Sequence, residues 1–328
     1  MKMDSLVVDD LSEFVKQAEQ NTDILGSYMG VRSWLLIAAG VLTGVLILAV
    51  IFLFYIYRKQ KKRKEEQIMS ASLASIEVPV ETVQIGKLHE QGERSGQQDC
   101  FGVSDESLLK THGLLAVVAD GMGGLSDGDK ISTAAVESVL DNFLLYQGKC
   151  TIEQQLLMLA QNAVESVNGL LGQNSFGKSG STLVMGILRD SVFSFLSIGD
   201  SRIYLYRHGI LMQLNREHVY RNKLALDAVN KEIALSDVYS DSRGSGLTSF
   251  LGMGTLQLID FPAEPIRLIS GDVLLLMSDG VYNALDKEEL AACLKGEPED
   301  AAEQLRNAIQ EKGYVNQDNY TAVIIACK

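Results

Sequence analysis

Aspartate residues stand at the ends of several apolar segments in this chain of 328 residues. They are Asp99, Asp120, Asp200, Asp279 and Asp318. Taken alone, such an aspartate is usually a turn or capping residue, because its side chain is disfavoured in strands and costly to bury unpaired. Several of them in one domain can converge where strands end, and converging carboxylates repel one another unless a cation lies between them. The pattern therefore predicts a cation site.

The ligand atoms available at these positions indicate which cation the site would take. Oxygen ligands without His or Cys select hard ions such as Mg²⁺ or Mn²⁺. Gly121 follows Asp120, and Gly280 follows Asp279. A glycine lets the bare backbone approach an ion and offer it a carbonyl oxygen.

The segments around the aspartates have the patterns of strands and helices in an α+β protein. Strands are predicted over 114–120, 181–188, 192–200, 202–207, 210–214, 272–280 and 320–327. Helices are predicted over 131–146, 152–171, 286–294 and 298–312, the last with Pro298 at its first position. The four central strands form two hairpins and the first two helices are consecutive, so we expect two packed sheets with helices outside. No βαβ alternation with a nucleotide-binding glycine loop is visible.

Seven segments of the chain match, in order, the motifs of a known family. They are RSGQQD (94–99), VVADGMGG (117–124), SGSTLVMGI (179–187), SIGDSRIYLYRHGILMQLNREH (197–218), LTSFLGMG (247–254), GDVLLLMSDGVYNAL (271–285) and QDNYTAVII (317–325). Through these motifs, residues 82–328 resemble the metal-dependent type 2C (PPM) serine/threonine protein phosphatases in their bacterial form. The resemblance implies a four-layer αββα sandwich of two antiparallel sheets flanked by helices, with a two-metal centre at one end.

The resemblance also implies a role for each residue of the metal centre. Asp120 would bridge two Mn²⁺ or Mg²⁺ ions, and Gly121 would give a backbone carbonyl. Asp279 and Asp318 would ligate one of these ions, and Asp200 would serve a third, looser ion shared with Asp279. Two divalent ions lower the pKa of a bridging water and hold the phosphoryl group for in-line displacement.

Two further residues complete, with Asp120, the catalytic group that the resemblance implies. Asp99 would hold metal-bound water, and Arg94 would bind the substrate phosphate, whose oxygens match a guanidinium in a bidentate manner. The chain departs from the family pattern at Gln98, where many relatives carry Glu, and at Met122, where eukaryotic relatives carry a His proposed as general acid. Protonation of the leaving group would then fall to water or another group.

Two features lie beside these motifs. Glu217–His218 replaces the family's usual Asp–His pair, and we expect His218 to be structural. Residues 221–246 should form the mobile flap beside the site, a segment that varies within the family. The sequence of this segment does not indicate a substrate.

The composition excludes some classes of function. The formal net charge is −13; residues 1–57 carry −3 and residues 58–64 carry +6, so residues 65–328 carry −16. So acidic a domain disfavours nucleic acid as a partner. The four cysteines are scattered without a CxxC pair, which favours reduced thiols over a zinc site or a disulfide framework.

The N-terminal part has the pattern of a membrane anchor. Residues 34–57 contain no charge, and a helix of this length spans about 36 Å, enough to cross a hydrocarbon core of ~30 Å. The basic residues of 58–64 follow at once, and such residues stay preferentially on the cytoplasmic side. We therefore expect a short extracytoplasmic N-terminus over 1–33, a single span over 34–57, a basic juxtamembrane segment and linker over 58–81, and a cytoplasmic domain over 82–328.

The sequence thus favours a membrane-anchored phosphatase of phosphoserine and phosphothreonine that opposes a Ser/Thr kinase at the cell membrane. Two alternatives stay open at this point. One is a pseudophosphatase, a phosphoprotein-binding signalling module, to which only Gln98 points. The other is a phosphatase of a partner-switching regulator, which would carry the same chemical groups.

Overall fold

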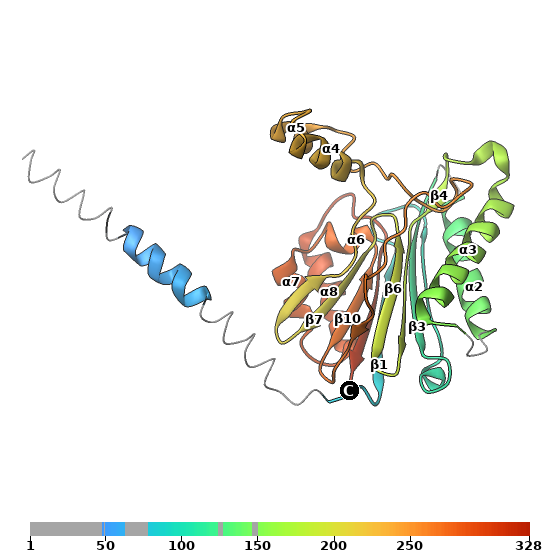
Figure 1. Cartoon of the computed structure of the whole chain (residues 1–328), viewed down its shortest axis with the longest axis horizontal. Coiled ribbons are helices and arrows are strands. Elements are labelled where there is room, and N and C mark those ends of the chain that lie inside the picture. The colour runs from blue at the N-terminus through green and yellow to red at the C-terminus, as the bar shows by residue number, and fades with distance from the viewer. Residues whose placement is uncertain (1–47, 49, 63–77, 124–126, 146–149) are drawn as a thin grey trace, which may run out of the picture. The chain divides into compact units, whose positions relative to one another are not determined.

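The structure is a computed structural model that describes residues 48, 50–62, 78–123, 127–145 and 150–328. The chain divides into two units, residues 1–75 and 76–328. In the first unit, residues 50–62 form a helix (Figure 1). Most of the predicted span over 34–57 lies outside the described residues. Within the ranges that are described, no helix combines the length and the apolar character that a membrane crossing requires.

The second unit contains two antiparallel sheets. The first has the strand order β1–β11–β10–β7–β8. Its strands are β1 (Val83–Glu90), β7 (Arg202–Arg207), β8 (Ile210–Gln213), β10 (Val273–Met277) and β11 (Tyr320–Cys327). The second sheet has the order β2–β3–β5–β6–β9, and β4 pairs with β3. Its strands are β2 (Asp99–Val103), β3 (Leu114–Met122), β4 (Gly180–Ser181), β5 (Leu183–Arg189), β6 (Val192–Ile198) and β9 (Ile266–Arg267).

The helices of this unit surround the sheets. They are α2 (Gly128–Leu144), α3 (Ile152–Leu171), α4 (Tyr220–Val229), α5 (Leu235–Ser240), α6 (Asp279–Tyr282), α7 (Lys287–Cys293) and α8 (Pro298–Lys312), with short 3₁₀ turns over Glu106–Leu108 and Gln173–Ser175. The four predicted helices correspond to α2, α3, α7 and α8. Pro298 begins α8 as predicted, since a proline there loses no intrahelical hydrogen bond.

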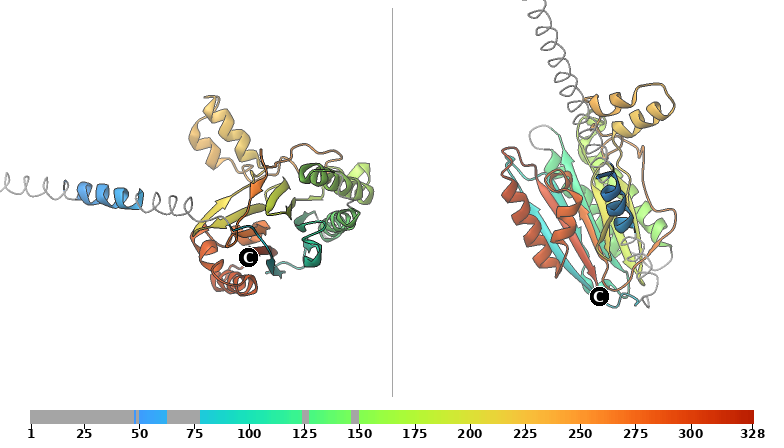
Figure 2. Two further views of the ribbon diagram at one scale, coloured as in Figure 1. Left: turned by 60° about the horizontal axis from the view of Figure 1, so that its bottom comes forward. Right: turned by 90° about the vertical axis from the view of Figure 1, so that its left-hand side faces the viewer.

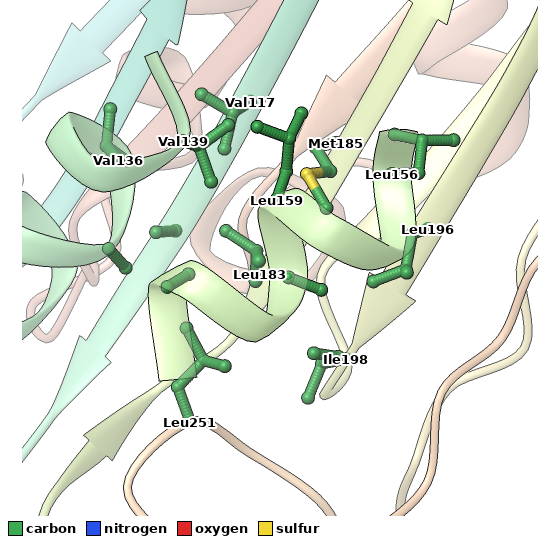
Figure 3. Packing of buried hydrophobic residues seen from close by; sticks show 14 of the residues in the cluster. Val117, Val136, Val139, Leu156, Leu159, Leu183, Met185, Leu196, Ile198 and Leu251 are labelled. Atoms are coloured by element: carbon green, nitrogen blue, oxygen red, sulfur yellow. The ribbon is translucent and has the colours of Figure 1, made fainter. Parts of the chain in front are cut away.

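Alternation of side chains along the strands produces four layers (Figures 1 and 2). In β3, Leu115, Val117 and Ala119 belong to a core cluster shared with α2 and α3, while Leu114, Ala116 and Val118 belong to a cluster between the two sheets. Figure 3 shows the first cluster, where Leu159 of α3 lies over Met185 of β5. A third cluster joins the other sheet to α7 and α8. The predicted αββα sandwich is therefore confirmed for this unit.

The two predicted hairpins are also confirmed, because β5 pairs with β6 and β7 with β8, both antiparallel. Two strand ends were predicted wrongly. The strand predicted over 272–280 ends at Met277, and Asp279 begins helix α6. Strand β3 continues past Asp120 to Met122, because Gly121 and Met122 pair with β4.

The predicted flap over 221–246 contains helices α4 and α5, which project from the sandwich in Figure 1. Its two ends are joined at its base, where Val219 bridges to Leu247 and the Tyr220 N–H donates to the carbonyl of Gly246. Within it, the Arg243 guanidinium pairs with Asp241 and lies 5.1 Å from the centre of the Tyr220 ring. The segment therefore forms two short helices whose ends are joined at the base, and its mobility stays a prediction.

Candidate metal centre

Four of the five predicted aspartates line one pocket of about 320 Å³ between the ends of the two sheets. The lining residues are Arg94, Gln98, Asp120, Gly121, Met122, Gly123, Thr182, Asp200, Leu247, Asp279, Asp318 and Asn319. Asp99 is not in the lining; it lies buried nearby, 5% exposed, within hydrogen-bonding reach of the strand that follows Asp318. The structure thus brings together all of the residues predicted from the strand-end pattern.

The pairing of β2 with β3 positions two of these carboxylates. Asp99 and Asp120 lie directly opposite one another in the antiparallel register. The backbone of Asp120 is fixed by Thr182, whose hydroxyl accepts from the Asp120 N–H at 3.0 Å and whose own N–H donates to the Asp120 carbonyl at 2.9 Å. Thr182 itself lines the pocket, although its sequence motif had suggested no role for it.

Asp279 and Asp318 lie at the ends of two neighbouring strands of the other sheet, β10 and β11. Asp279 is the first residue of α6, and Asp318 lies just before β11. A Cβ placed on Gly280 would lie 2.0 Å from the carbonyl oxygen of Asn319, so only a glycine allows this approach. In the structure, Gly280 is required by this contact between the two segments, and its predicted approach to an ion stays a prediction.

Asn319 organises the loop that carries Arg94. Its side-chain amide donates to the carbonyls of Gln91 at 2.7 Å and Gly96 at 3.0 Å, and its oxygen accepts from the Gln98 N–H at 2.8 Å. Sequence reasoning missed this role, although Asn319 stands next to Asp318 in a motif already singled out. The side chain closes the 91–98 loop over the start of β11.

Arg94 lies at the mouth of the pocket. Its guanidinium Nη2 donates to Oδ2 of Asp318 at 2.6 Å, and its side chain is 57% exposed. The charges of Asp318, Asp279 and Asp120 all favour the charged form of Arg94 and raise its pKa. A mostly exposed guanidinium next to four carboxylates is placed to meet an incoming anion.

Burial raises the pKa of four carboxyl groups at the centre, those of Asp99, Asp120, Asp200 and Asp279. The pKa of Asp99 rises to about 7 and that of Asp200 to about 6, chiefly through burial. The pKa of Asp120 rises well above its ordinary value through burial and the charges of Asp99 and Asp279, and that of Asp279 rises through burial and the charge of Asp318. These carboxyl groups therefore resist being ionised at the same time. A bound cation would favour their ionised forms and so remove this resistance.

The donor chemistry of this pocket fits hard divalent cations, since its four carboxyl groups offer oxygen ligands and, among the described residues, no His or Cys lines it. In the ranges that the structure describes, no three His, Cys, Asp or Glu side chains are arranged to hold one ion. Two of the carboxyl groups have protein partners instead: Asp318 pairs with Arg94, and Asp279 accepts a hydrogen bond from the Asn283 amide at 3.2 Å. Coordination would require these carboxyls to exchange those partners for the cations.

Gly121 serves close packing of three backbone segments. A Cβ at this position would lie 2.1 Å from the carbonyl oxygen of Gly128, at the start of α2, and 2.6 Å from that of Gln98. The Gly121 N–H donates to the same Gln98 carbonyl at 3.0 Å. The glycine is therefore required by the approach of α2 and β2, and its offer of a carbonyl to an ion remains a prediction.

The three departures from the family motifs lie as follows. Gln98 and Met122 both line the pocket, and Met122 has no proton to give to a leaving group. His218 lines a different cavity of about 800 Å³ and accepts at Nδ1 from the Gly199 N–H at 3.1 Å. Burial lowers the pKa of His218, which keeps this nitrogen free to accept. The geometry agrees with the predicted structural role of His218.

Comparisons with known proteins agree with this geometry. The family model described as Protein phosphatase 2C matches residues 85–317. The serine/threonine phosphatase stp of Listeria monocytogenes serotype 4b is 28% identical over 216 residues, which cover 64% of this chain and 83% of the relative.

Solved structures share the fold. PppA of Pseudomonas aeruginosa, described as a key regulatory component of T6SS, has a TM-score of 0.62 and 25% identity, covering 76% of this chain and 100% of its own. The catalytic domain of the serine/threonine protein phosphatase PstP, in complex with two manganese ions, has a TM-score of 0.59 and 20% identity, covering 75% and 98%. Because it is only 20% identical, the PstP structure supports the fold alone.

Proposed function

The chain belongs to the protein phosphatase 2C family and is a serine/threonine phosphoprotein phosphatase, and from this membership we propose a two-metal, membrane-tethered enzyme. One observation carries the two-metal part of the proposal. Asp120, Asp200, Asp279 and Asp318 line one pocket with an exposed arginine at its mouth. Half-buried carboxyl groups beside an exposed guanidinium suit metal-assisted hydrolysis of a phosphate ester.

Two Mn²⁺ or Mg²⁺ ions would be held by this chain's oxygen atoms. Asp120 would contact both, with the carbonyl of Gly121, while Asp279 and Asp318 would contact one, and Asp200 would serve a possible third. When bound, the ions would supply an activated water and neutralise charge on the phosphoryl group. Burial raises the pKa of both Asp120 and Asp279, so any proton that these carboxyl groups hold would leave on binding, since coordination needs both ionised.

Other side chains would bind and orient the reactants. Arg94 would exchange Asp318 for the phosphate oxygens, because a guanidinium matches them in a bidentate manner. Asp99 would accept a hydrogen bond from the attacking water. Water attacks phosphorus as the bond to the serine or threonine oxygen breaks, and that oxygen takes its proton from water or another group, since Met122 can donate none.

The proposal includes attachment to the cell membrane. Residues 34–57 are uncharged and long enough to span a bilayer, and the basic residues of 58–64 would keep the following domain cytoplasmic. Phosphoprotein substrates of a cytoplasmic Ser/Thr kinase would then be within reach. Membrane fractions of cells that express the full chain should contain it, and a chain that starts at residue 65 should leave them; equal partition of both chains would disprove the anchor.

The enzymatic proposal is tested with residues 65–328 and a phosphothreonine peptide. Hydrolysis should require Mn²⁺ or Mg²⁺, stop with a chelator, and be lost in Asp120→Asn. If the wild type and Asp120→Asn release phosphate at the same rate, the proposed centre is not the site of reaction. Absence of Mn²⁺ binding in calorimetry would instead favour the pseudophosphatase, to which Gln98 points.

A further inference from the structure

His89 and Thr321 form a cross-strand pair near the metal centre. They are directly opposite in the antiparallel register of β1 and β11. The His89 Nδ1 lies 2.9 Å from the Thr321 Oγ1, and the His89 ring packs against Phe101 of β2 with 5.2 Å between ring centres. His89 is exposed, whereas Thr321 is fully buried. The imidazole therefore reaches from the surface to a buried hydroxyl.

The same hydroxyl contacts the buried carboxyl group of the centre. The Ser278 Oγ donates to Oδ2 of Asp99 at 2.6 Å, and the Thr321 side chain lies close enough to Asp99 to favour its ionised form. The Ser278 Oγ in turn accepts from the Thr321 N–H at 3.0 Å. Asp99 thus lies beside two hydroxyl groups. The Ser278 oxygen accepts from the Thr321 N–H, and the Thr321 oxygen lies next to the His89 Nδ1.

Counting protons assigns a direction to the chain of hydrogen bonds. A threonine hydroxyl has one proton and an ionised carboxylate has none. If Thr321 donates to ionised Asp99, its oxygen must accept from His89, and Nδ1 must carry a proton. In the opposite direction, Thr321 would donate its only proton to the His89 Nδ1. Asp99 would then receive no hydrogen bond from Thr321, and could contact the Thr321 oxygen favourably only if Asp99 itself were protonated.

We propose that His89 is a positioning residue of the phosphatase: its Nδ1–H holds the Thr321 hydroxyl toward Asp99, which keeps that carboxylate oriented for the attacking water. The inference rests on the proposed function, since it deepens the role given to Asp99. His89 neither lines the pocket nor is expected to touch the substrate. Residues that orient a ligand of the reaction are commonly fixed by such a second hydrogen bond.

Substitutions at position 89 separate the two ring nitrogens. The amide nitrogen of Asn can occupy the position of Nδ1, and that of Gln the position of Nε2. In the full-length chain with Mn²⁺, His89→Ala and His89→Gln should lower kcat about tenfold, with little change in KM. His89→Asn should retain most of the wild-type kcat. Lys87→Ala is the control, since Lys87 is exposed on the same strand two residues earlier.

Coupling through Thr321 is tested by a double-mutant cycle. Thr321→Val removes the hydroxyl at nearly constant volume, and Thr321→Ser keeps it. His89→Ala should lower kcat in the wild-type and Thr321→Ser backgrounds and have no further effect in Thr321→Val, because the contact it breaks is already absent. Melting temperatures identify any variant that fails to fold.

A measurement on the metal-free chain is independent of activity. Burial lowers the pKa of His89, so the ring is neutral at pH 8, and ¹⁵N NMR of histidine-labelled chain should show Nδ1 as the protonated nitrogen. A proton on Nε2 alone, equal rates for His89→Asn and His89→Gln, or an additive cycle would each overturn the inference. If the wild type itself released no phosphate with Mn²⁺, the proposed function would fail instead, whatever the NMR result.

Discussion

Asp99 and Asp120 face one another across the β2–β3 pair, so that two neighbouring strands deliver two carboxyl groups to the same end of the sandwich. Asp99 is buried and Asp120 is half-buried, and the charge of Asp99 disfavours ionisation of Asp120. A fold that served stability alone would not keep such a pair. The arrangement is explained by a site whose ligand supplies positive charge.

Asp120→Asn should therefore separate stability from activity. Loss of the central carboxylate should lower phosphatase activity by more than ~100-fold, since even residues that only orient ligands commonly cost 10–100-fold. The same change removes one charge from a repelling cluster, so the metal-free variant should melt at a higher temperature than the wild type. Activity on a phosphothreonine peptide and melting with EDTA measure the two effects.

The exposed Asp141 of α2 provides the control, because Asp141→Asn should change neither quantity. A metal-free Asp120→Asn protein that melts below the wild type would show that repulsion among the carboxylates does not govern the stability of this site.

The raised pKa values predict an unusual pH dependence for the metal-free protein. Asp99 titrates at about 7 and Asp200 at about 6 in the folded state, above the ordinary value of 3.8. Between pH 4 and 7 the folded protein therefore binds more protons than the unfolded chain, and the free energy of unfolding should fall as pH rises through this window. Melting with EDTA should occur at a higher temperature at pH 5.5 than at pH 8.

Mn²⁺ should reverse this trend, because it binds the ionised carboxylates and releases their protons. Its affinity should rise from pH 5.5 to pH 8, as measured by calorimetry. The variant Asp99→Asn/Asp200→Asn should show a flatter dependence of melting on pH with EDTA. An unchanged slope in this variant would assign the effect to other groups.

Much of the fold could be predicted because its strands and helices are long and regular. Strand β11 is mostly apolar and is buried along its whole length, since it lies between β1 and β10 inside its sheet. Strand β1 was missed because it lies at the sheet edge, where Gln84, Lys87 and His89 are exposed and interrupt the apolar pattern. Local periodicity reports burial, so an edge strand gives a weak signal.

The aspartates of the site could also be predicted, whereas the residues that orient them could not. Asp120 and Asp279 stand out as acids beside apolar runs. Asn319 and Thr321 are ordinary polar residues at the start of β11, and their partners Gln91 and His89 lie 228 and 232 positions away. Such contacts depend on the register between β1 and β11, and one sequence contains no information on that register.

Arg94 should contribute to substrate binding in a way that lysine cannot reproduce. Arg94→Lys should raise KM for a phosphothreonine peptide about tenfold, because an ammonium group loses the bidentate match to phosphate. Stability should change little, since the pair with Asp318 is exposed and such pairs contribute about 0–1 kcal/mol. Initial rates over a range of peptide concentrations give KM.

Arg306→Lys is the matched control, because Arg306 pairs with Glu90 and Glu303 away from the pocket. Equal KM values for Arg94→Lys and the wild type would remove Arg94 from phosphate binding.

Gly121→Ala should destabilise the protein through a collision between backbones. The added Cβ would lie 2.1 Å from the Gly128 carbonyl, an atom that cannot move without shifting the start of α2. We expect a loss of about 1–3 kcal/mol in the free energy of unfolding, as for other overpacked sites. Gly96→Ala, in the loop that carries Arg94, should cost far less, because its Cβ would meet no atom within 4 Å. Urea unfolding measures both losses, and equal losses would show that the start of α2 and the end of β3 are not packed as the structure has them.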